Sequence, residues 1–197
     1  MFREYTPKRR NITTDVSAYR KHRNDLKIDY KNRCGYCNDI DTWRFIWFEI
    51  DHFIPKTRNK KPFLTIKTET DYSNLVYSCR SCNNAKRNKW PSNNQNIPNI
   101  NNKGFIDPCD DNYSEQFDRL DSGRIIPKTE LGEWMYNAMK LYKPQHEIIW
   151  NIDLLDKLID EIEELLKSSP SDELTSRLLK GYREFKKYVK DLSSAGF

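Results

Sequence analysis

The sequence lacks any apolar run that approaches the roughly 20 residues a membrane-spanning helix needs. Its first residues, MFREYTPKRRN, are basic but lack the apolar stretch of a signal peptide. Only 37% of the residues are hydrophobic, yet 13% are aromatic, which argues against simple disorder. We therefore expect a soluble, cytoplasmic protein with no membrane association.

Acidic residues are scarce in the first part of the chain. Residues 1–90 contain 20 Lys and Arg against 10 Asp and Glu, a net charge of +10, whereas the remaining 107 residues carry 14 against 19, a net charge of −5. Lys and Arg gain affinity for nucleic acids by releasing counterions from phosphates. The basic half indicates a polyanionic partner, although a solvated basic surface would give the same composition.

The five cysteines do not form the pattern of a secreted, disulfide-bonded protein. Cys34 and Cys37 form one Cys-x-x-Cys pair, and Cys79 and Cys82 form a second about forty residues later. Four thiolates in this arrangement are typical of one tetrahedral zinc ion, and they leave no coordination position open for a substrate. The sequence therefore predicts a structural Zn²⁺, and Cys109 is left as a small buried side chain.

Periodicity and turn residues predict the secondary structure. The expected segments are a helix at 16–32, a strand within 42–55, an exposed loop at 57–70, a strand at 74–79, a helix at 80–90, an irregular linker at 92–104 and a short strand pair between 105 and 134. From Ile148 onward, apolar residues recur at spacings of three and four, and a break at 168–172 separates two such stretches. The tail is therefore expected to be an αα-hairpin.

Three polar features lie between the cysteine pairs and just after them. Asp51 and His52 are adjacent at the expected end of the first strand, where a histidine beside a carboxylate can also be a satisfied core residue. Asn74 begins the second strand, and Asn83 and Asn84 follow the last cysteine, although asparagine is also a common turn residue. Each feature is weak alone, and only their combination and order are informative.

The pattern C-G-Y-C, E-I-D-H-F-I-P, N-L-V and C-R-S-C-N-N-A-K resembles the HNH nuclease family over roughly residues 30–90, with weaker similarity to about residue 145. The resemblance implies an α+β fold: an HNH ββα-metal core in a treble-clef-like, four-cysteine zinc knuckle, with an added C-terminal α-helical hairpin. The expected division is residues 1–91 for the nuclease core with its basic arm and helix, 92–146 for a linker and irregular extension, and 147–197 for the amphipathic hairpin.

The resemblance also implies site residues. His52 matches the general base, Asp51 the carboxylate on the catalytic metal, and Asn74 the asparagine that orients the histidine and steadies the hairpin. Asn83 matches the last motif position, where many members have a second histidine, so this is an H-N-N variant; Asn84 is the alternative ligand. An Asp and Asn ligand set is rich in oxygen and favours Mg²⁺ or Mn²⁺.

The remaining expectations concern geometry and charge. Neighbouring residues on a regular strand point to opposite faces, so we expect a twist or bulge that lets Asp51 and His52 approach one phosphate. Glu49 is expected to pair with a surface lysine rather than the metal, and His22 and His146 to be surface or structural residues. The residues predicted to contact backbone phosphates, with a solvated surface as the alternative, are Lys56, Arg58, Lys60, Lys61, Arg80, Lys86, Arg87 and Lys89.

The function expected from these observations is metal-dependent hydrolysis of nucleic acid, with DNA as the expected substrate. One alternative is a non-catalytic, zinc-containing binding module. Another is an effector subunit that needs a partner, such as an ATPase docked on the C-terminal helices, although the apolar stripes of those helices would also suit packing back onto the core. The layout resembles effectors of bacterial anti-phage systems of the Septu type.

Overall fold

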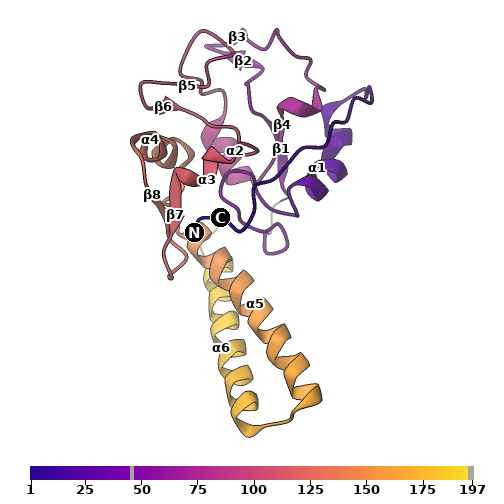
Figure 1. Ribbon diagram of the computed structural model, residues 1–197, viewed down its shortest axis with the longest axis vertical. Helices are drawn as coiled ribbons and strands as arrows, with labels where there is room; N and C mark the ends of the chain where they lie inside the picture. The colour runs from indigo at the N-terminus through magenta and orange to yellow at the C-terminus, as the bar shows by residue number, and fades with distance from the viewer. Residues whose placement is uncertain (45–46, 195–197) are drawn as a thin grey trace.

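The computed structural model describes residues 1–44 and 47–194, which form a mixed α/β arrangement of helices and small two-stranded sheets (Figure 1). β1 (Glu49–His52) pairs antiparallel with β4 (Leu75–Ser78), and α2 (Arg80–Lys86) begins directly after β4. All four residues of β4 are buried. This strand pair and α2 therefore form the buried frame on which the candidate site is built.

β1 is shorter than the strand expected within 42–55, because β4 offers only four residues for pairing before α2 begins. Residues 45–46 of the expected strand lie outside the described residues. The ladder continues through every residue pair of β1, so the expected bulge at Asp51 and His52 is absent from it. Their side chains consequently point to opposite faces of the strand.

The segment before β1 holds less helix than expected. A 3-10 turn, η1 (Tyr19–His22), leads into α1 (Arg23–Asp29), whereas the sequence predicts one helix over 16–32. Lys31 and Asn32 have φ angles of 49° and 58°, a left-handed conformation that ends a helix. The chain then enters the first cysteine pair.

The basic N-terminal arm packs onto the protein instead of extending into solvent. Phe2 and Arg3 are buried, and the Arg9 guanidinium forms two hydrogen bonds to Asp107, of 2.9 and 3.0 Å. Arg9 Nε also donates to the Leu75 carbonyl of β4. The main core that the arm helps to cover includes Leu26, Tyr30, Tyr36, Val76, Phe105, Tyr113, Phe117, Met135 and Met139.

Two small hairpins occupy segments that were expected to be irregular. β2 (Thr57–Arg58) pairs with β3 (Lys61–Pro62) inside the expected loop, and β5 (Asn99–Ile100) pairs with β6 (Lys103–Gly104) inside the expected linker. Each turn contains two consecutive residues with positive φ, the conformation that tight hairpin turns require. A short 3-10 helix, η2 (Tyr72–Asn74), precedes β4.

β7 (Phe117–Arg119) and β8 (Ile125–Pro127) confirm the expected strand pair, with Gly123 at φ 90° in their turn. α3 (Asn112–Glu115) precedes the pair and α4 (Glu130–Met139) follows it. Neither of these two helices is among the segments expected from the sequence. α4 packs against α2 and β6, so this region supports the candidate site from behind.

α5 (Pro144–Ser168) and α6 (Asp172–Ser194) confirm the predicted helical hairpin. The base of the hairpin packs through Ile149, Ile152 and Leu192, and the rest projects away from the strands (Figure 1). Within the part of the chain that the structure describes, no helix is both long and apolar enough to span a membrane.

Candidate active site

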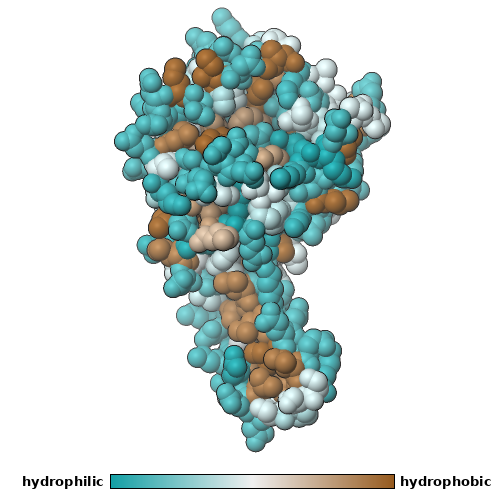
Figure 2. All heavy atoms as spheres, viewed as in Figure 1, coloured by the Kyte–Doolittle hydropathy of each residue, from teal (hydrophilic) through white to brown (hydrophobic). Residues whose placement is uncertain are grey.

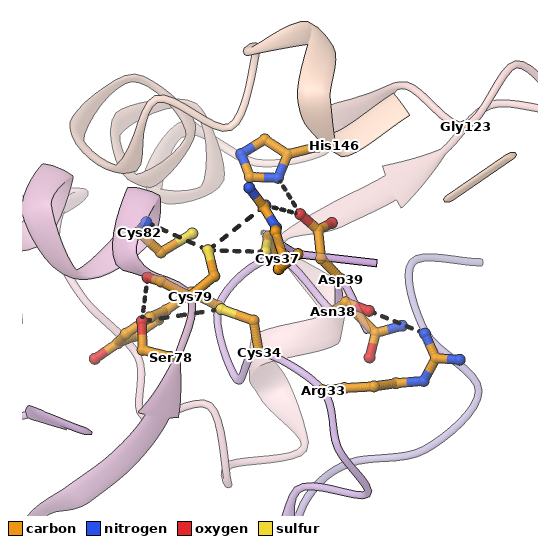
Figure 3. Close-up of polar contacts among 12 residues, drawn as sticks. Arg33, Cys34, Cys37, Asn38, Asp39, Ser78, Cys79, Cys82, Gly123 and His146 are labelled. Atoms are coloured by element: carbon orange, nitrogen blue, oxygen red, sulfur yellow. Dashed lines mark hydrogen bonds and ion pairs between the residues drawn. The ribbon is translucent and has the colours of Figure 1, made fainter. Parts of the chain in front are cut away.

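The four cysteines of the two pairs converge on one point. Cys34 and Cys37 come from the loop after α1, Cys79 caps α2, and Cys82 lies in its first turn (Figure 3). All four are buried, and their sulfur atoms lie within 4.8 Å of one another. The Cys37 and Cys79 sulfurs are 3.8 Å apart, the edge of a tetrahedron with arms of about 2.3 Å, the usual Zn–S bond length. The four residues therefore fit a structural zinc ion.

Three polar side chains, Asp39, Arg44 and His146, support the cysteine cluster on the side that faces α5. His146 Nδ1 donates to Asp39 at 2.7 Å (Figure 3). Arg44 contacts both Asp39 and the Cys79 sulfur, the latter at 3.7 Å. His146 is 1% exposed, so of its two expected roles the structural one holds and the surface one is wrong. Its ligand atom also lies within 4.8 Å of those of Cys37 and Asp39. Because Cys37 already belongs to the four-cysteine cluster, we interpret Asp39 and His146 as its supports.

Asp51 lies on the face of β1 that α2 covers, and its carboxylate is engaged there. Its Oδ2 accepts hydrogen bonds from Tyr36 at 2.5 Å and from Lys86 at 2.8 Å. Lys86 is fully buried and also donates to the carbonyl of His52 at 2.8 Å. Tyr36 was not predicted as a site residue. Its position in the sequence between Cys34 and Cys37 is a signal that could have indicated it, because those cysteines belong to the motif.

Glu49 lies on the same face of β1, one strand repeat before Asp51, and contacts Asn83 of α2. Asn83 Nδ2 donates to Glu49 Oε2 at 2.5 Å, and Arg80 lies 3.7 Å from the other carboxylate oxygen. Asn83 therefore contacts Glu49, and Asp51 contacts Lys86; the expectation that Asp51 and Asn83 bind one metal ion stays a prediction. Glu49 does form a surface ion pair as expected, but its cation is an arginine.

His52 lies on the opposite face of β1. Its Nε2 is 2.8 Å from the Glu69 carbonyl, and because a carbonyl only accepts, Nε2 carries the proton and Nδ1 is the nitrogen that can accept one. Burial lowers the pKa of His52 below its ordinary value, and Lys56 acts in the same direction against the opposing effects of the Glu69 carbonyl and Asp51. The Tyr19 ring packs against the His52 imidazole in a T-shaped arrangement, with the two ring centroids 4.8 Å apart. The lowered pKa favours the neutral form of the His52 imidazole at neutral pH.

Asn74 fixes the chain just beyond His52. Its Oδ1 accepts from the Ile54 amide at 2.8 Å, and its Nδ2 donates to the Ile54 carbonyl at 3.1 Å. The Asn74 backbone carbonyl also accepts from Phe53 at 2.8 Å. These three bonds hold the exit of β1 against the entry of β4, where the side chain of Asn74 is 1% exposed.

Comparison with known proteins adds one finding to this geometry. Residues 34–89 match the family model described as HNH endonuclease. This HNH segment contains the four cysteines, β1, β4 and α2, and at the level of the family it indicates a nucleic-acid endonuclease. No curated protein and no solved structure gives a significant match to the chain.

The basic residues of the HNH segment differ in their environments. Lys86 is buried against Asp51, so the prediction that it contacts phosphates is wrong. Lys89 donates to the carbonyls of Ala85 and Ala138, at 2.6 and 2.8 Å, which engages its ammonium group within the protein. The other predicted phosphate contacts are at least partly exposed: Lys56, Arg58, Lys60, Lys61, Arg80 and Arg87.

The cysteine cluster predicts a protein that depends on zinc for its fold. Purified protein is expected to contain one zinc ion per four-cysteine cluster, and Cys79→Ser is expected to lose it and unfold, because structural zinc contributes about 10 kcal/mol or more, comparable with a whole domain's stability. Metal analysis and thermal unfolding measure both effects. Cys109→Ser, outside the cluster, is the matched control and should keep its zinc. A stable, zinc-free Cys79→Ser protein would contradict a structural role.

Proposed function

We propose that this chain is a metal-dependent endonuclease that hydrolyses phosphodiester bonds of nucleic acid, with DNA as its substrate. The state of His52 carries the proposal: Nε2 is held by a carbonyl, burial lowers the pKa, and the residue lies in the HNH segment. A neutral imidazole with one nitrogen fixed in this way is suited to take a proton from water at neutral pH. The family match favours this function over a non-catalytic binding module.

In the proposed reaction, the water oxygen attacks the phosphorus atom and gives a proton to His52 Nδ1. The bond between phosphorus and the 3′ oxygen breaks, and this leaving oxygen takes a proton from solvent water. Proton transfer by a positioned side chain contributes about 10²–10⁴-fold in rate. The Glu69 carbonyl orients the ring, and Lys86 binds the backbone carbonyl of His52, so the ring and the strand that carries it are both fixed. The family resemblance implies a 5′-phosphate and a 3′-hydroxyl as products.

The α2-facing side of β1 supplies the donors for a catalytic Mg²⁺ or Mn²⁺ ion. We assign Asp51 and Asn83 as ligands and add Glu49, whose carboxylate already contacts Asn83. Both hydrogen bonds of Asp51 engage Oδ2, so Oδ1 is committed to neither Tyr36 nor Lys86. Such oxygen donors fit a hard divalent ion, which when bound neutralises charge on the phosphoryl and leaving oxygens. Exposed Asn84 is the alternative to Asn83.

The proposed architecture follows from the same elements. β1, β4 and α2 form the HNH ββα-metal core, and the four-cysteine cluster forms its treble-clef-like knuckle. Residues 1–91 are the proposed core unit, with 92–146 as an extension behind it and 147–197 as the hairpin. The contact of α4 with α2 gives the extension a supporting function.

The outer part of the hairpin supports a role in binding a protein partner. Figure 2 shows apolar atoms along it, and Leu154, Leu158, Leu165, Leu179 and Tyr182 are each 39–53% exposed. This part of the hairpin does not pack back onto the core. Packing onto the core, the alternative considered from the sequence, therefore does not account for its apolar side chains. The proposed partner is an ATPase in a cytoplasmic, Septu-type anti-phage complex.

The nuclease proposal predicts nicking of supercoiled plasmid by the purified, zinc-loaded protein when Mg²⁺ or Mn²⁺ is added. His52→Ala should lower the rate by about 10²–10⁴-fold, because it removes the general base. Gel analysis of nicked product measures this, and metal analysis verifies that the variant keeps its zinc. Equal cutting by both proteins would contradict the assignment of His52.

The proposed ligand set predicts that Glu49 and Asp51 respond differently to loss of charge. Glu49→Gln should lower metal-dependent cutting by at least about tenfold with little change in thermal stability, because Glu49 is partly exposed. Asp51→Asn should also destabilise the fold by about 3–5 kcal/mol, because it leaves buried Lys86 without its counter-charge. Thermal unfolding beside the cutting assay separates the two effects.

The matched control for these variants is Glu115→Gln, which changes an exposed carboxylate far from the HNH segment in sequence. It should leave both the cutting rate and the unfolding temperature unchanged. Full metal-dependent activity in Glu49→Gln would remove Glu49 from the ligand set, and an unchanged unfolding temperature in Asp51→Asn would contradict the ion pair with Lys86.

A further inference from the structure

One aromatic side chain near the candidate site is almost entirely exposed. Trp47, two residues before Glu49, has 83% of its surface accessible to solvent, whereas Trp90 is 6% exposed. An indole is the largest apolar side chain, and folding normally buries most of it. An indole exposed beside a candidate active site is suited to bind a ligand that has a flat apolar face.

Trp47 borders a groove that leads to the candidate metal ligands. The groove has a volume of about 490 Å³ and also contains the side chains of Glu49 and Asn83. Tyr19 also lines the groove, and the centroid of its ring lies 4.8 Å from that of the His52 ring. A molecule in this groove would therefore contact Trp47, two of the proposed metal ligands and the tyrosine that packs on His52.

The charge of the groove suits a polyanion. Arg20, Arg23 and Arg80 all line it, and Glu49 is the only acidic residue among the described residues that do. Arg80 is 3.7 Å from that carboxylate and more than half exposed, so it is available to a phosphate as well. Arginine guanidinium groups bind phosphate oxygens, while an aromatic face binds a base by stacking.

We propose that Trp47 is a stacking platform for the base of an unpaired nucleotide, whose flanking phosphates contact Arg20 and Arg80. The base of a paired nucleotide is covered on both faces within the duplex, so only an unpaired base can offer a free face to an indole. The preferred substrate is thus a strand with unpaired bases, such as a single strand or a flap, and not uniform duplex. This inference rests on the proposed nuclease function, and it names the substrate of that site.

Binding of a fluorescein-labelled DNA strand of about 12 nucleotides, followed by fluorescence anisotropy without added divalent ion, tests the proposal. The single strand should bind the zinc-loaded protein more tightly than its duplex. Trp47→Ala should weaken that binding about tenfold, as expected for one stacked base, and Trp47→Phe should restore part of it. Leu120→Ala, which removes an exposed apolar side chain outside the HNH segment and the groove, is the control and should bind normally.

Abasic strands identify stacking more directly than truncation of the indole. Removing the base that stacks should weaken binding by the wild-type protein and have no further effect on Trp47→Ala. An RNA strand of the same sequence is measured in parallel. Stacking-dependent binding of the DNA or the RNA strand supports the proposal, and the strand that binds more tightly shows which sugar the protein prefers. Equal binding by Trp47→Ala and wild type, or equal loss on every abasic strand, would overturn it.

The design separates this inference from the nuclease proposal. Binding that depends on Trp47, without cutting when Mg²⁺ is added, would support the stacking site and reject the nuclease. Cutting that requires His52, that proceeds equally on duplex and single strand with the wild-type protein, and that is unchanged in Trp47→Ala would support the nuclease and reject the stacking site.

Discussion

The four-cysteine cluster is the constraint on which the rest of the structure depends. It joins the loop after α1 to the N-terminus of α2, two segments that are about forty residues apart in the sequence. That connection fixes where β4 ends and α2 begins. β1 can therefore pair with β4 only over residues 75–78. The same cluster reaches the C-terminal hairpin through Asp39 and His146. One four-cysteine cluster thereby sets the position of the candidate active site and of the hairpin.

A second constraint is the buried ion pair behind β1. An ion pair in a protein interior is costly to desolvate, and it is tolerated when its remaining hydrogen-bonding groups are satisfied. Tyr36 and the His52 carbonyl satisfy Asp51 and Lys86 in this way. Because Lys86 binds both the Asp51 side chain and the His52 backbone, it couples the two residues that carry the proposed chemistry. In the proposed reaction, the substrate phosphate lies at the end of β1, where groups on both faces of the strand can reach it.

The sequence predicted the features that depend on local patterns. The cysteine spacing predicted the cluster, and regular apolar spacing predicted α5 and α6 to within a few residues. The segment 42–48 is rich in residues that favour strands, yet its described part is not a strand, because β4 provides no partner beyond Ser78. α4 was missed although Leu131, Trp134, Met135, Ala138 and Met139 recur at helical spacing, because the turn signals earlier in this stretch favoured a strand pair.

The candidate site was predicted in its residues but not in its contacts. Motif order alone indicated His52, Asn74 and Asn83, and their assigned functions remain proposals. The burial of Lys86 could not be read from a segment rich in lysine and arginine, because only the tertiary position of α2 decides which of those cations faces Asp51. The contact of Glu49 with Asn83 depends on that same placement.

The most direct measurement is a crystal structure of the zinc-loaded protein soaked with Mn²⁺, with the ion located by its anomalous scattering. The expected result is one manganese peak on the α2-facing side of β1, about 2.1 Å from oxygen atoms of Asn83 and of Asp51 or Glu49, with Lys86 still on Asp51 Oδ2. A manganese ion bound elsewhere, with this face of β1 empty, would contradict the assignment of the catalytic centre.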